Sequence, residues 1–376
     1  MKIVIVIPTY NEAENVGRLL PLILKETENF SHHEINILVV DDSSPDGTAD
    51  IVSDLSQEYK NIHLLLRKEK EGLGAAYIHG FKYAMENMGA EAVIEMDADF
   101  QHDPKDLPKL IEELDKGADY VIGSRFIEGG SIPKEWAFYR KFLSVVGNIV
   151  SKMVLGVFNI NDFTTGFKLT RVEGFLNRVD LGAVNSKGFA YKIDLLYKMS
   201  QLGAKICEVP IKFGLRGQGD SKMERDNAID SLKVIILLRI RRHLSFLKFV
   251  VVGFIGLFVD STSFNILRIT PLGSDTASYA SGLIGMLTTY TLNNLWSFGD
   301  RKIEKNSKKI ISFIVYCVSS YIPIIFRSWL IGYSTTRFGD TFVTSNLAFF
   351  VGIFIGLIWN YAVYSRLIWK KNVKIG

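Results

Sequence analysis

The feature that most limits what this chain can fold into is a change in composition near residue 245. Between Ser245 and Phe298 only four side chains are charged: Lys248, Asp260, Arg268 and Asp275. Four apolar stretches follow one another from there, each close to the roughly 20 residues that cross a bilayer: residues 249–267, 277–296, 310–333 and 344–364. We expect four membrane helices, although Pro323 and Arg327 weaken the third.

Basic side chains around these stretches predict how the helices are oriented. They gather before the first stretch, between the second and third, and after the fourth: Arg239, Arg241, Arg242 and Lys248; Arg301, Lys302, Lys305, Lys308 and Lys309; Arg366, Lys370, Lys371 and Lys374. Because basic residues concentrate on the cytoplasmic side, we expect both ends of the chain and its large N-terminal part in the cytoplasm. The alternative, buried helices of a large soluble protein, is disfavoured because alternating basic flanks seldom arise by chance.

The remaining composition excludes several classes of protein. The chain has 376 residues, of which 48% are hydrophobic, and this fits two or three domains that are not all soluble. Its net charge of +4 is mild and gives no reason to expect nucleic-acid binding. Cys207 and Cys317 match no metal or redox spacing, so we interpret both as buried thiols. The opening "MKIVIVIPTYNE" has too short an apolar run for a signal peptide, so we expect the chain to start in the cytoplasm.

The first half alternates strand-like and helix-like segments. Short runs rich in Val and Ile predict five strands, at residues 2–8, 35–42, 62–67, 92–99 and 119–125. Most are followed by helical periodicity, as in residues 11–28 and 104–117. This order predicts a mostly parallel, Rossmann-like sheet covered by helices on both faces, with ligands beyond the carboxyl ends of the strands. Neither a Gly-rich dinucleotide fingerprint nor the phosphate loop of nucleotide hydrolases is present, which disfavours those two classes of enzyme.

The fourth predicted strand delivers two carboxylates and an amide close together. In "VIEMDADFQHDP", Asp97, Asp99 and Gln101 alternate with Ala98 and Phe100. If the segment is extended, the three polar side chains share one face, because side chains two apart in a strand point the same way. Two carboxylates that converge repel each other, so we expect a cation between them.

Six motifs then carry a resemblance to a known family. They are "IVIPTYNEAENV", "VVDDSSPDGTAD", "GLGAAYIHGF", "MDADFQHDP", "GSRF" and "TTGFKLTR". In this order they resemble the motifs of family 2 glycosyltransferases, and within that family those of the dolichyl-phosphate mannose synthases, over residues 1 to about 240. The C-terminal half, with "KFVVVGFIG" and "NNLWSF", resembles the small four-helix membrane proteins of the GtrA family. The resemblance implies a catalytic domain of GT-A type at residues 1–230 and a transmembrane domain at residues 244–376.

The resemblance also implies a nucleotide-sugar site. The residues that match it are Pro8, Tyr10, Glu12, Asp41, Asp42, Asp97, Ala98, Asp99, Gln101, Arg216 and Lys222. Within this set Asp97, Asp99 and Gln101 match the family's metal and diphosphate site, so the expected cation is Mg²⁺ or Mn²⁺, which take oxygen ligands. Arg216 is expected to reach the diphosphate, with Ser221 and Lys222 on the same loop. For Asp42 and Ser43 a plain role in a turn or helix cap stays open.

The same resemblance implies an acceptor site for a lipid phosphate, at Arg125, Arg140 and Ser144. Planar guanidinium groups suit this bidentate task, and together with Asp99 the two arginines are the expected catalytic residues. A lipid phosphate is already an anion at neutral pH, so a general base is unnecessary. We therefore expect His102 to form a local hydrogen bond rather than to act as a catalyst.

Two segments near the acceptor residues are amphipathic. Residues 133–158 and 226–243 combine aromatic and aliphatic side chains with arginines and lysines, which is typical of helices that lie in a membrane interface. The alternative is a pair of ordinary surface helices packed on the sheet.

These observations predict an inverting enzyme that transfers mannose from GDP-mannose to dolichyl or another polyprenyl phosphate. Two alternatives stay open: a UDP-glucose-dependent glucosyltransferase of the same plan, and a flippase for lipid-linked sugars in which the soluble domain regulates. For the flippase, the polar residues in or near the spans would mark a pathway, although hydrogen bonds between helices also explain them: Asp260, Asn265, Asn293 and Asn294.

Overall fold

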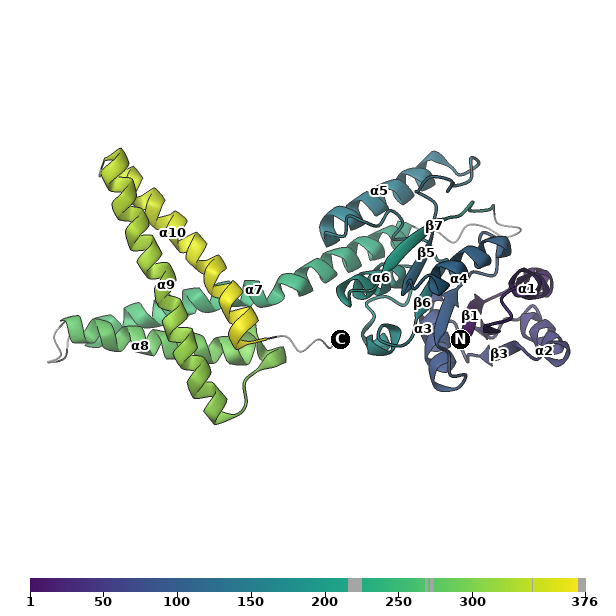
Figure 1. Ribbon diagram of the computed structural model, residues 1–376, viewed down its shortest axis with the longest axis horizontal. Coiled ribbons are helices and arrows are strands. Elements are labelled where there is room, and N and C mark those ends of the chain that lie inside the picture. The colour runs from purple at the N-terminus through teal and green to yellow at the C-terminus, as the bar shows by residue number, and fades with distance from the viewer. Residues whose placement is uncertain (216–224, 268–269, 271–273, 340, 371–376) are drawn as a thin grey trace. The chain divides into compact units, whose positions relative to one another are not determined.

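The computed structural model describes residues 1–376 except residues 216–224, 268–269, 271–273, 340 and 371–376. The chain divides into two compact units, Met1–Arg239 and Ile240–Val373. We describe each unit by itself (Figure 1).

The first unit is built on one seven-stranded sheet with the order β3-β2-β1-β4-β6-β5-β7. The strands are β1 (Lys2–Thr9), β2 (Glu34–Asp41), β3 (Ile62–Leu66), β4 (Ala92–Glu95), β5 (Tyr120–Ser124), β6 (Lys168–Arg171) and β7 (Ile206–Pro210). Six of them run parallel, while β6 is antiparallel to its neighbours β4 and β5. The expected mostly parallel sheet is thereby confirmed. β6 and β7 were not predicted, because "KLTR" and "ICEVP" are too short and too mixed to stand out as strands.

Helices cover both faces of this sheet (Figure 1). On one face α1 (Ala13–Thr27), α2 (Thr48–Glu58) and α4 (Leu107–Asp115) pack on alternate strand residues such as Ile5 and Ile37. On the other face α3 (Leu73–Glu86), α6 (Tyr191–Gln201) and the first part of α7 (Arg225–Leu267) pack on the intervening residues such as Val4 and Val6. The helix α5 (Phe138–Leu155) joins this second layer only through its last turn, at Leu155. Burial on both faces explains why the strands read as continuous apolar runs.

The second unit is helical. It contains the rest of α7, then α8 (Ser274–Leu292), α9 (Asn306–Phe338) and α10 (Phe342–Val363). Three helical stretches of the described chain are long and apolar enough to cross a membrane: Leu244–Leu267, Asn306–Phe338 and Phe350–Ile368. Most of their surface is exposed within the unit, as expected for helices that face lipid. The chain is therefore a membrane protein. A fourth span at α8 stays a prediction, because α8 is helical but is not among these three.

One of the polar residues predicted near the spans has a structural role. Asn294 is buried in a short helical turn, Asn293–Ser297, that follows α8. Its Oδ1 accepts hydrogen bonds from the backbone N–H of Ile303 (2.8 Å) and from the indole N–H of Trp369 (2.8 Å). Asn294 thus ties together the ends of three helical segments, which favours packing over a transport pathway at this position.

Candidate functional site

A cavity of about 1100 Å³ lies at the carboxyl ends of the central strands. Segments that follow β1, β2, β4 and β5 supply its polar wall. The N-terminal part of α7 and one side of α5 supply an apolar wall. The described residues of both walls belong to the first unit. Its place at the strand ends agrees with the general rule for ligand sites in open α/β sheets.

Three of these strand ends hold an unusual backbone conformation. Asn11 after β1, Ser43 after β2 and Phe100 after β4 are the non-glycine residues with positive φ in the described chain, at 58°, 53° and 61°. Such values are uncommon for residues with a side chain and persist where the surrounding structure imposes them. Around Ser43, for example, the side-chain hydroxyl donates to the carbonyl oxygen of Arg67 at 2.6 Å. The rim of the cavity is therefore a set of fixed turns.

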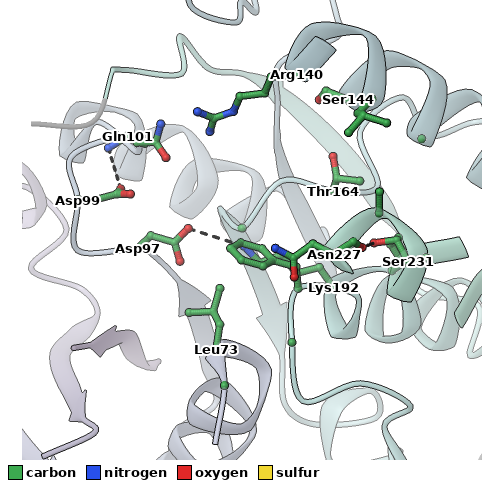
Figure 2. Close-up of a pocket in the computed structure, with 18 of the residues that line it drawn as sticks. Leu73, Asp97, Asp99, Gln101, Arg140, Ser144, Thr164, Lys192, Asn227 and Ser231 are labelled. Carbon is green, nitrogen blue, oxygen red and sulfur yellow. Dashed lines mark hydrogen bonds and ion pairs between the residues drawn. The ribbon is translucent and has the colours of Figure 1, made fainter. Parts of the chain in front are cut away.

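The segment with the two carboxylates is not extended, which corrects our expectation. β4 ends at Glu95, and residues 98–102 form bends in which Phe100 is left-handed. Phe100 packs against the hydrophobic core below, Asp97, Asp99 and Gln101 line the cavity, and Ala98 contacts both. The three polar side chains converge, as Figure 2 shows, but turns bring them together rather than strand alternation. Two aspartates, an amide and a proline within a few residues indicate such a turn.

Asp97 is held by its neighbours on both oxygens. Its Oδ1 accepts a hydrogen bond from the hydroxyl of Tyr77 at 2.8 Å, and its Oδ2 lies 3.7 Å from the ammonium of Lys192. Lys192 comes from α6, is almost fully buried and lines the same cavity (Figure 2). A Cβ at Gly166 would overlap the lysine ammonium, so a side chain there would have to displace the end of Lys192. This places a cation next to Asp97 that the sequence reasoning missed.

Lys192 belongs to a larger buried network. Below the cavity, Glu95 accepts a hydrogen bond from the hydroxyl of Tyr191 at 2.6 Å, and burial raises the pKa of Glu95. Burial also lowers the pKa of Lys168 to about 8, and the ammonium of this residue donates to the backbone oxygen of Lys192 at 3.1 Å. Glu95, Lys168 and Lys192 are thus buried together next to the partly buried Asp97, so that acids and lysines offset one another's charge.

The side-chain oxygens of Asp99 and Gln101 are suitable ligands for a hard divalent ion. The Asp99 side chain is buried at the cavity, and its Oδ1 accepts the backbone N–H of Gln101 at 3.1 Å. The amide nitrogen of Gln101 donates to the carbonyl oxygen of Gly214 at 3.4 Å, which turns the amide oxygen away from that contact. Carboxylate and amide oxygens are the ligands that Mg²⁺ and Mn²⁺ prefer. Asp97 fits this role less well than predicted, because Tyr77 and Lys192 already engage its oxygens.

His102 has the local role that we expected. Its Nδ1 accepts the backbone N–H of Asp97 at 3.1 Å, and its ring stacks on Phe167. Burial lowers the pKa of His102 to about 4, so the ring is neutral at physiological pH. A neutral ring whose Nδ1 is already in a hydrogen bond positions the Asp97 segment and is poorly placed to act as a general base.

The two aspartates after β2 take different roles. Asp42 lines the cavity and is paired with Arg67, Oδ1 to Nη1 at 2.6 Å, while burial raises its pKa. Asp41 is fully buried and does not line the cavity. Its carboxylate accepts from the hydroxyls of Thr9 (2.8 Å) and Ser44 (2.6 Å). Asp41 therefore shapes the turn, and its place in the nucleotide-sugar set stays a prediction, whereas Asp42 faces the cavity.

The other residues predicted for the nucleotide end also line the cavity: Pro8, Tyr10, Glu12 and Ala98. The ammonium of Lys70 lies 3.9 Å from the ring centre of Tyr10, a cation–π contact at the same wall. Arg216, Ser221 and Lys222 lie outside the described residues.

The predicted acceptor residues separate into two kinds. Arg125 is buried and forms a two-pronged ion pair with Asp162, with Nε and Nη2 each 2.7 Å from a carboxylate oxygen. Its Nη2 also donates to the hydroxyl of Thr164 at 2.7 Å. Burial alone would raise the pKa of Asp162, but Arg125 holds this pKa below its usual value. Arg125 is thus paired within the protein, although it also lines the cavity, and its binding of the lipid phosphate stays a prediction.

Arg140 is placed differently. It projects from α5 into the cavity, above Asp99 and Gln101, and Ser144 follows one turn later on the same helix (Figure 2). Its guanidinium lies 3.7 Å from the ring centre of Trp136. Stacking on an indole fixes the orientation of the planar group. Arg140 therefore presents an oriented guanidinium to the cavity, where it can meet an incoming anion.

Beyond Arg140 and Ser144 the cavity becomes apolar. From α5 it is lined by Leu143, Val146, Gly147 and Val150, and from α7 by Ala228, Ile229, Leu232 and Ile235. The outer side of α5 exposes further large apolar side chains: Phe138, Phe142, Val145, Ile149 and Met153. A polar end and an apolar end in one cavity suit a ligand that is itself amphipathic.

Sequence comparisons decide the family. Residues 4–177 match the model for glycosyl transferase family 2, and residues 248–369 match the model for the GtrA/DPMS transmembrane domain. Over 223 residues the chain is 41% identical to the undecaprenyl-phosphate mannosyltransferase of Micrococcus luteus, an alignment that covers 59% of this chain and 88% of that relative. The chain belongs to glycosyl transferase family 2. The family resemblance that the six motifs suggested is thereby confirmed.

Two further relatives of this family 2 glycosyltransferase cover different lengths of it. The polyprenol monophosphomannose synthase of Mycolicibacterium smegmatis is 41% identical over 61% of this chain and 83% of that relative. The dolichol-phosphate mannosyltransferase of Pyrococcus furiosus is 29% identical over 98% of this chain and 99% of that relative. The second alignment includes the transmembrane part as well as the catalytic domain.

Some residues of the glycosyltransferase site carried no signal in the sequence. Lys192 lies in "GFAYKIDLLYK", which has helical periodicity and no motif, and Asp162 precedes the "TTGFKLTR" motif without belonging to it. Only the structure identifies them, because Lys192 forms an ion pair with Asp97 and Asp162 forms one with Arg125. Asp162 had one indirect signal: the buried arginine of a motif requires a nearby carboxylate.

Proposed function

We propose that this glycosyltransferase moves mannose from GDP-mannose to dolichyl phosphate or another polyprenyl phosphate, with inversion at the sugar carbon. The observation that carries the proposal is the cavity with two unlike ends. One end offers carboxylate and amide oxygens with cationic side chains, and the other is an apolar passage between α5 and α7. A nucleoside-diphosphate sugar fits the first end, and a phosphate with an isoprenoid chain fits across the junction. The names of the three relatives, which join mannose to an undecaprenyl, polyprenol or dolichol phosphate, support the sugar and the acceptor.

The protein's own residues suffice for most of the chemistry. At the donor end Asp42 and Tyr10 line the space for the nucleoside, and Lys192 faces the diphosphate and sugar. Asp99 and Gln101, with Asp97 beside them, would hold a Mg²⁺ or Mn²⁺ ion, which when bound stabilises the negative charge of the leaving diphosphate. At the acceptor end Arg140 offsets the repulsion between two anionic substrates and orients the lipid phosphate.

No proton needs to be removed from the nucleophile. An oxygen of the ionised lipid phosphate attacks the anomeric carbon of mannose as the bond to the diphosphate breaks, so the bonding electrons leave with GDP. The neutral, buried His102 agrees with this scheme, because it lies under the Asp97 segment and serves as a hydrogen-bond acceptor. Attack from the face opposite the diphosphate inverts the configuration.

The membrane half would keep the catalytic domain at its lipid substrate. We propose that both ends of the chain lie in the cytoplasm, since basic residues flank the predicted spans on that side. The exposed apolar side of α5 and the amphipathic start of α7 would lie in the membrane interface, where an isoprenoid chain can enter the cavity.

The proposal is tested by the identity of the product. Purified full-length protein is incubated with Mn²⁺, a polyprenyl phosphate and either GDP-mannose or UDP-glucose, and the lipid product is identified by mass. We expect a hexosyl lipid with GDP-mannose and at least about a hundredfold less with UDP-glucose. Transfer of glucose at the higher rate would establish the glucosyltransferase alternative, and no transfer from either donor would contradict the function.

Lys192 allows a second test at the donor end. Replacing Lys192 with Met removes a buried cation beside Asp97, and hydrogen bonds to charged groups are worth about 1.5–3 kcal/mol. Calorimetric affinity for GDP-mannose should fall by about 10-fold to 100-fold. The matched control is Lys198→Met on the same helix, because Lys198 pairs with Asp194 and does not line the cavity. Equal donor affinity in the Lys192→Met protein and the control would remove Lys192 from the site.

A further inference from the structure

A second cluster of ligand-type side chains lies at the opposite edge of the sheet. His32 and His33 form the turn before β2, and Asp115 ends α4 on the way to β5. This is the edge where β2 and β5 begin, whereas the substrate cavity lies where the strands end. None of the three residues lines that cavity or plays a part in the proposed transfer.

The three side chains meet at one point. The Nε2 of His33 lies 2.8 Å from Oδ1 of Asp115, and the Nε2 of His32 lies 3.0 Å from Oδ2 of the same carboxylate. The three groups offer one ligand atom each, and these atoms all lie within 4.8 Å of one another. The two imidazole rings lie side by side, with centres 4.1 Å apart. Two residues adjacent in sequence thus meet a third that is more than eighty residues away.

We propose that His32, His33 and Asp115 bind a divalent transition-metal ion such as Zn²⁺. Ligands at tetrahedral angles around zinc, at about 2.0–2.2 Å from the ion, are about 3.4 Å apart. The two nitrogen–oxygen distances, 2.8 Å and 3.0 Å, involve different oxygens of Asp115 and are shorter than that spacing, so the three groups have to move apart to admit the ion. Two imidazoles and one carboxylate favour Zn²⁺, Co²⁺ or Ni²⁺ over Mg²⁺, which prefers oxygen ligands alone.

The surroundings include charge of both signs. The N-terminal ammonium lies 3.3 Å from Nδ1 of His33, and the negative groups of the site have to offset it. Asp115 is the last residue of α4, where the helix dipole adds negative potential to that of the carboxylate. The side chain of His33 is only 4% exposed, which limits the movement of one ligand, whereas His32 at 59% leaves a path for the ion and for a water ligand. A bound ion would link the turn before β2 to the end of α4 and so stabilise the domain rather than take part in transfer.

The test uses full-length protein with a purification tag that contains no histidine. An Asp99→Ala background removes the metal ligand of the substrate cavity, and Zn²⁺ binding is measured by calorimetry and Co²⁺ binding by visible absorption. We expect one ion per chain in this background. Loss of an outer contact to a metal ligand typically weakens binding 10-fold to 100-fold, so loss of a direct ligand in His33→Ala should weaken it at least about 100-fold.

Two further variants make the result specific. Asp115→Asn retains a hydrogen-bonding side chain but loses the charge, and it should lose zinc together with the zinc-induced rise in Tm. The control is His63→Ala, because His63 on β3 is hydrogen-bonded to Asn36 on β2 and lies outside the cluster. This variant should bind zinc as the background does. The proposal is overturned if the Asp99→Ala background binds no zinc, or if His33→Ala and Asp115→Asn bind it like the control. Mannosyl transfer by His33→Ala with Asp99 intact should equal that of the unmodified protein, so this site and the proposed function can fail separately.

Discussion

Replacing Asp99 with Ala should abolish metal-dependent transfer, with a loss of at least about a thousandfold in kcat/KM. The carboxylate is buried, faces the cavity beside Gln101 and carries the oxygen ligands that a divalent ion prefers. Removing it therefore removes the main anchor for the ion that stabilises the leaving diphosphate. Transfer is measured over a Mn²⁺ titration, because a weakened site would recover at high metal concentration and an absent one would not.

The stability of this variant is a separate expectation. Asp99 is buried and accepts one backbone hydrogen bond, so its removal should cost about 1 kcal/mol, more than the 0.5 kcal/mol typical of an exposed carboxylate. The matched control is Asp103→Ala in the same segment, which loses a similar bond to the N–H of Lys105 and does not line the cavity. If Asp99→Ala keeps more than about a tenth of the activity of this control, the ion is bound elsewhere.

Replacing Arg125 with Ala should mainly lower the stability of the domain, whereas replacing Arg140 with Ala should mainly lower transfer. Arg125→Ala leaves Asp162 buried without its partner, and breaking a buried ion pair costs about 3–5 kcal/mol. The Tm of the catalytic domain should fall by roughly 10 °C or more. Arg140→Ala removes a guanidinium that lines the cavity and stacks on Trp136, so we expect a smaller fall in Tm than for Arg125→Ala, while transfer is lost.

The prediction for Arg140→Ala also distinguishes donor binding from acceptor binding. Arg140→Ala should bind GDP-mannose with near-normal affinity and require far more polyprenyl phosphate for half-maximal rate, because loss of one charged partner typically costs about 2–5 kcal/mol. Arg140→Lys should recover part of the activity, since an ammonium retains the charge but not the planar fork. If calorimetry instead finds donor affinity lost and acceptor half-saturation unchanged, Arg140 belongs with the diphosphate. If Arg125→Ala is as stable as Arg140→Ala, the ion pair with Asp162 is not structural.

Several features of this protein could be predicted from the sequence because they are local. The apolar stretches beyond residue 245 predict membrane helices by length alone, and a strand buried on both faces produces a continuous apolar run such as that of β1. The motifs placed Asp97, Asp99 and Gln101 at one strand end, and the structure does bring them to one cavity. The extended backbone expected for this segment was wrong, because the left-handed turn at Phe100 depends on packing below it and not on its neighbours in the chain.

Only the tertiary structure decided which charged side chains are paired with one another within the protein. Arg125 and Arg140 look alike in the sequence, yet one lies against Asp162, 37 residues later, and the other stacks on Trp136 in the turn before its own helix. Asp41 and Asp42 are adjacent, yet one is turned into the protein and the other into the cavity. Lys192 reaches Asp97 from a helix that follows all six motifs. The sequence by itself determined which side chains are present at each strand end. Their protein partners are set by contacts between distant segments, and burial makes each such pairing decisive because an unpaired charge inside a protein is costly.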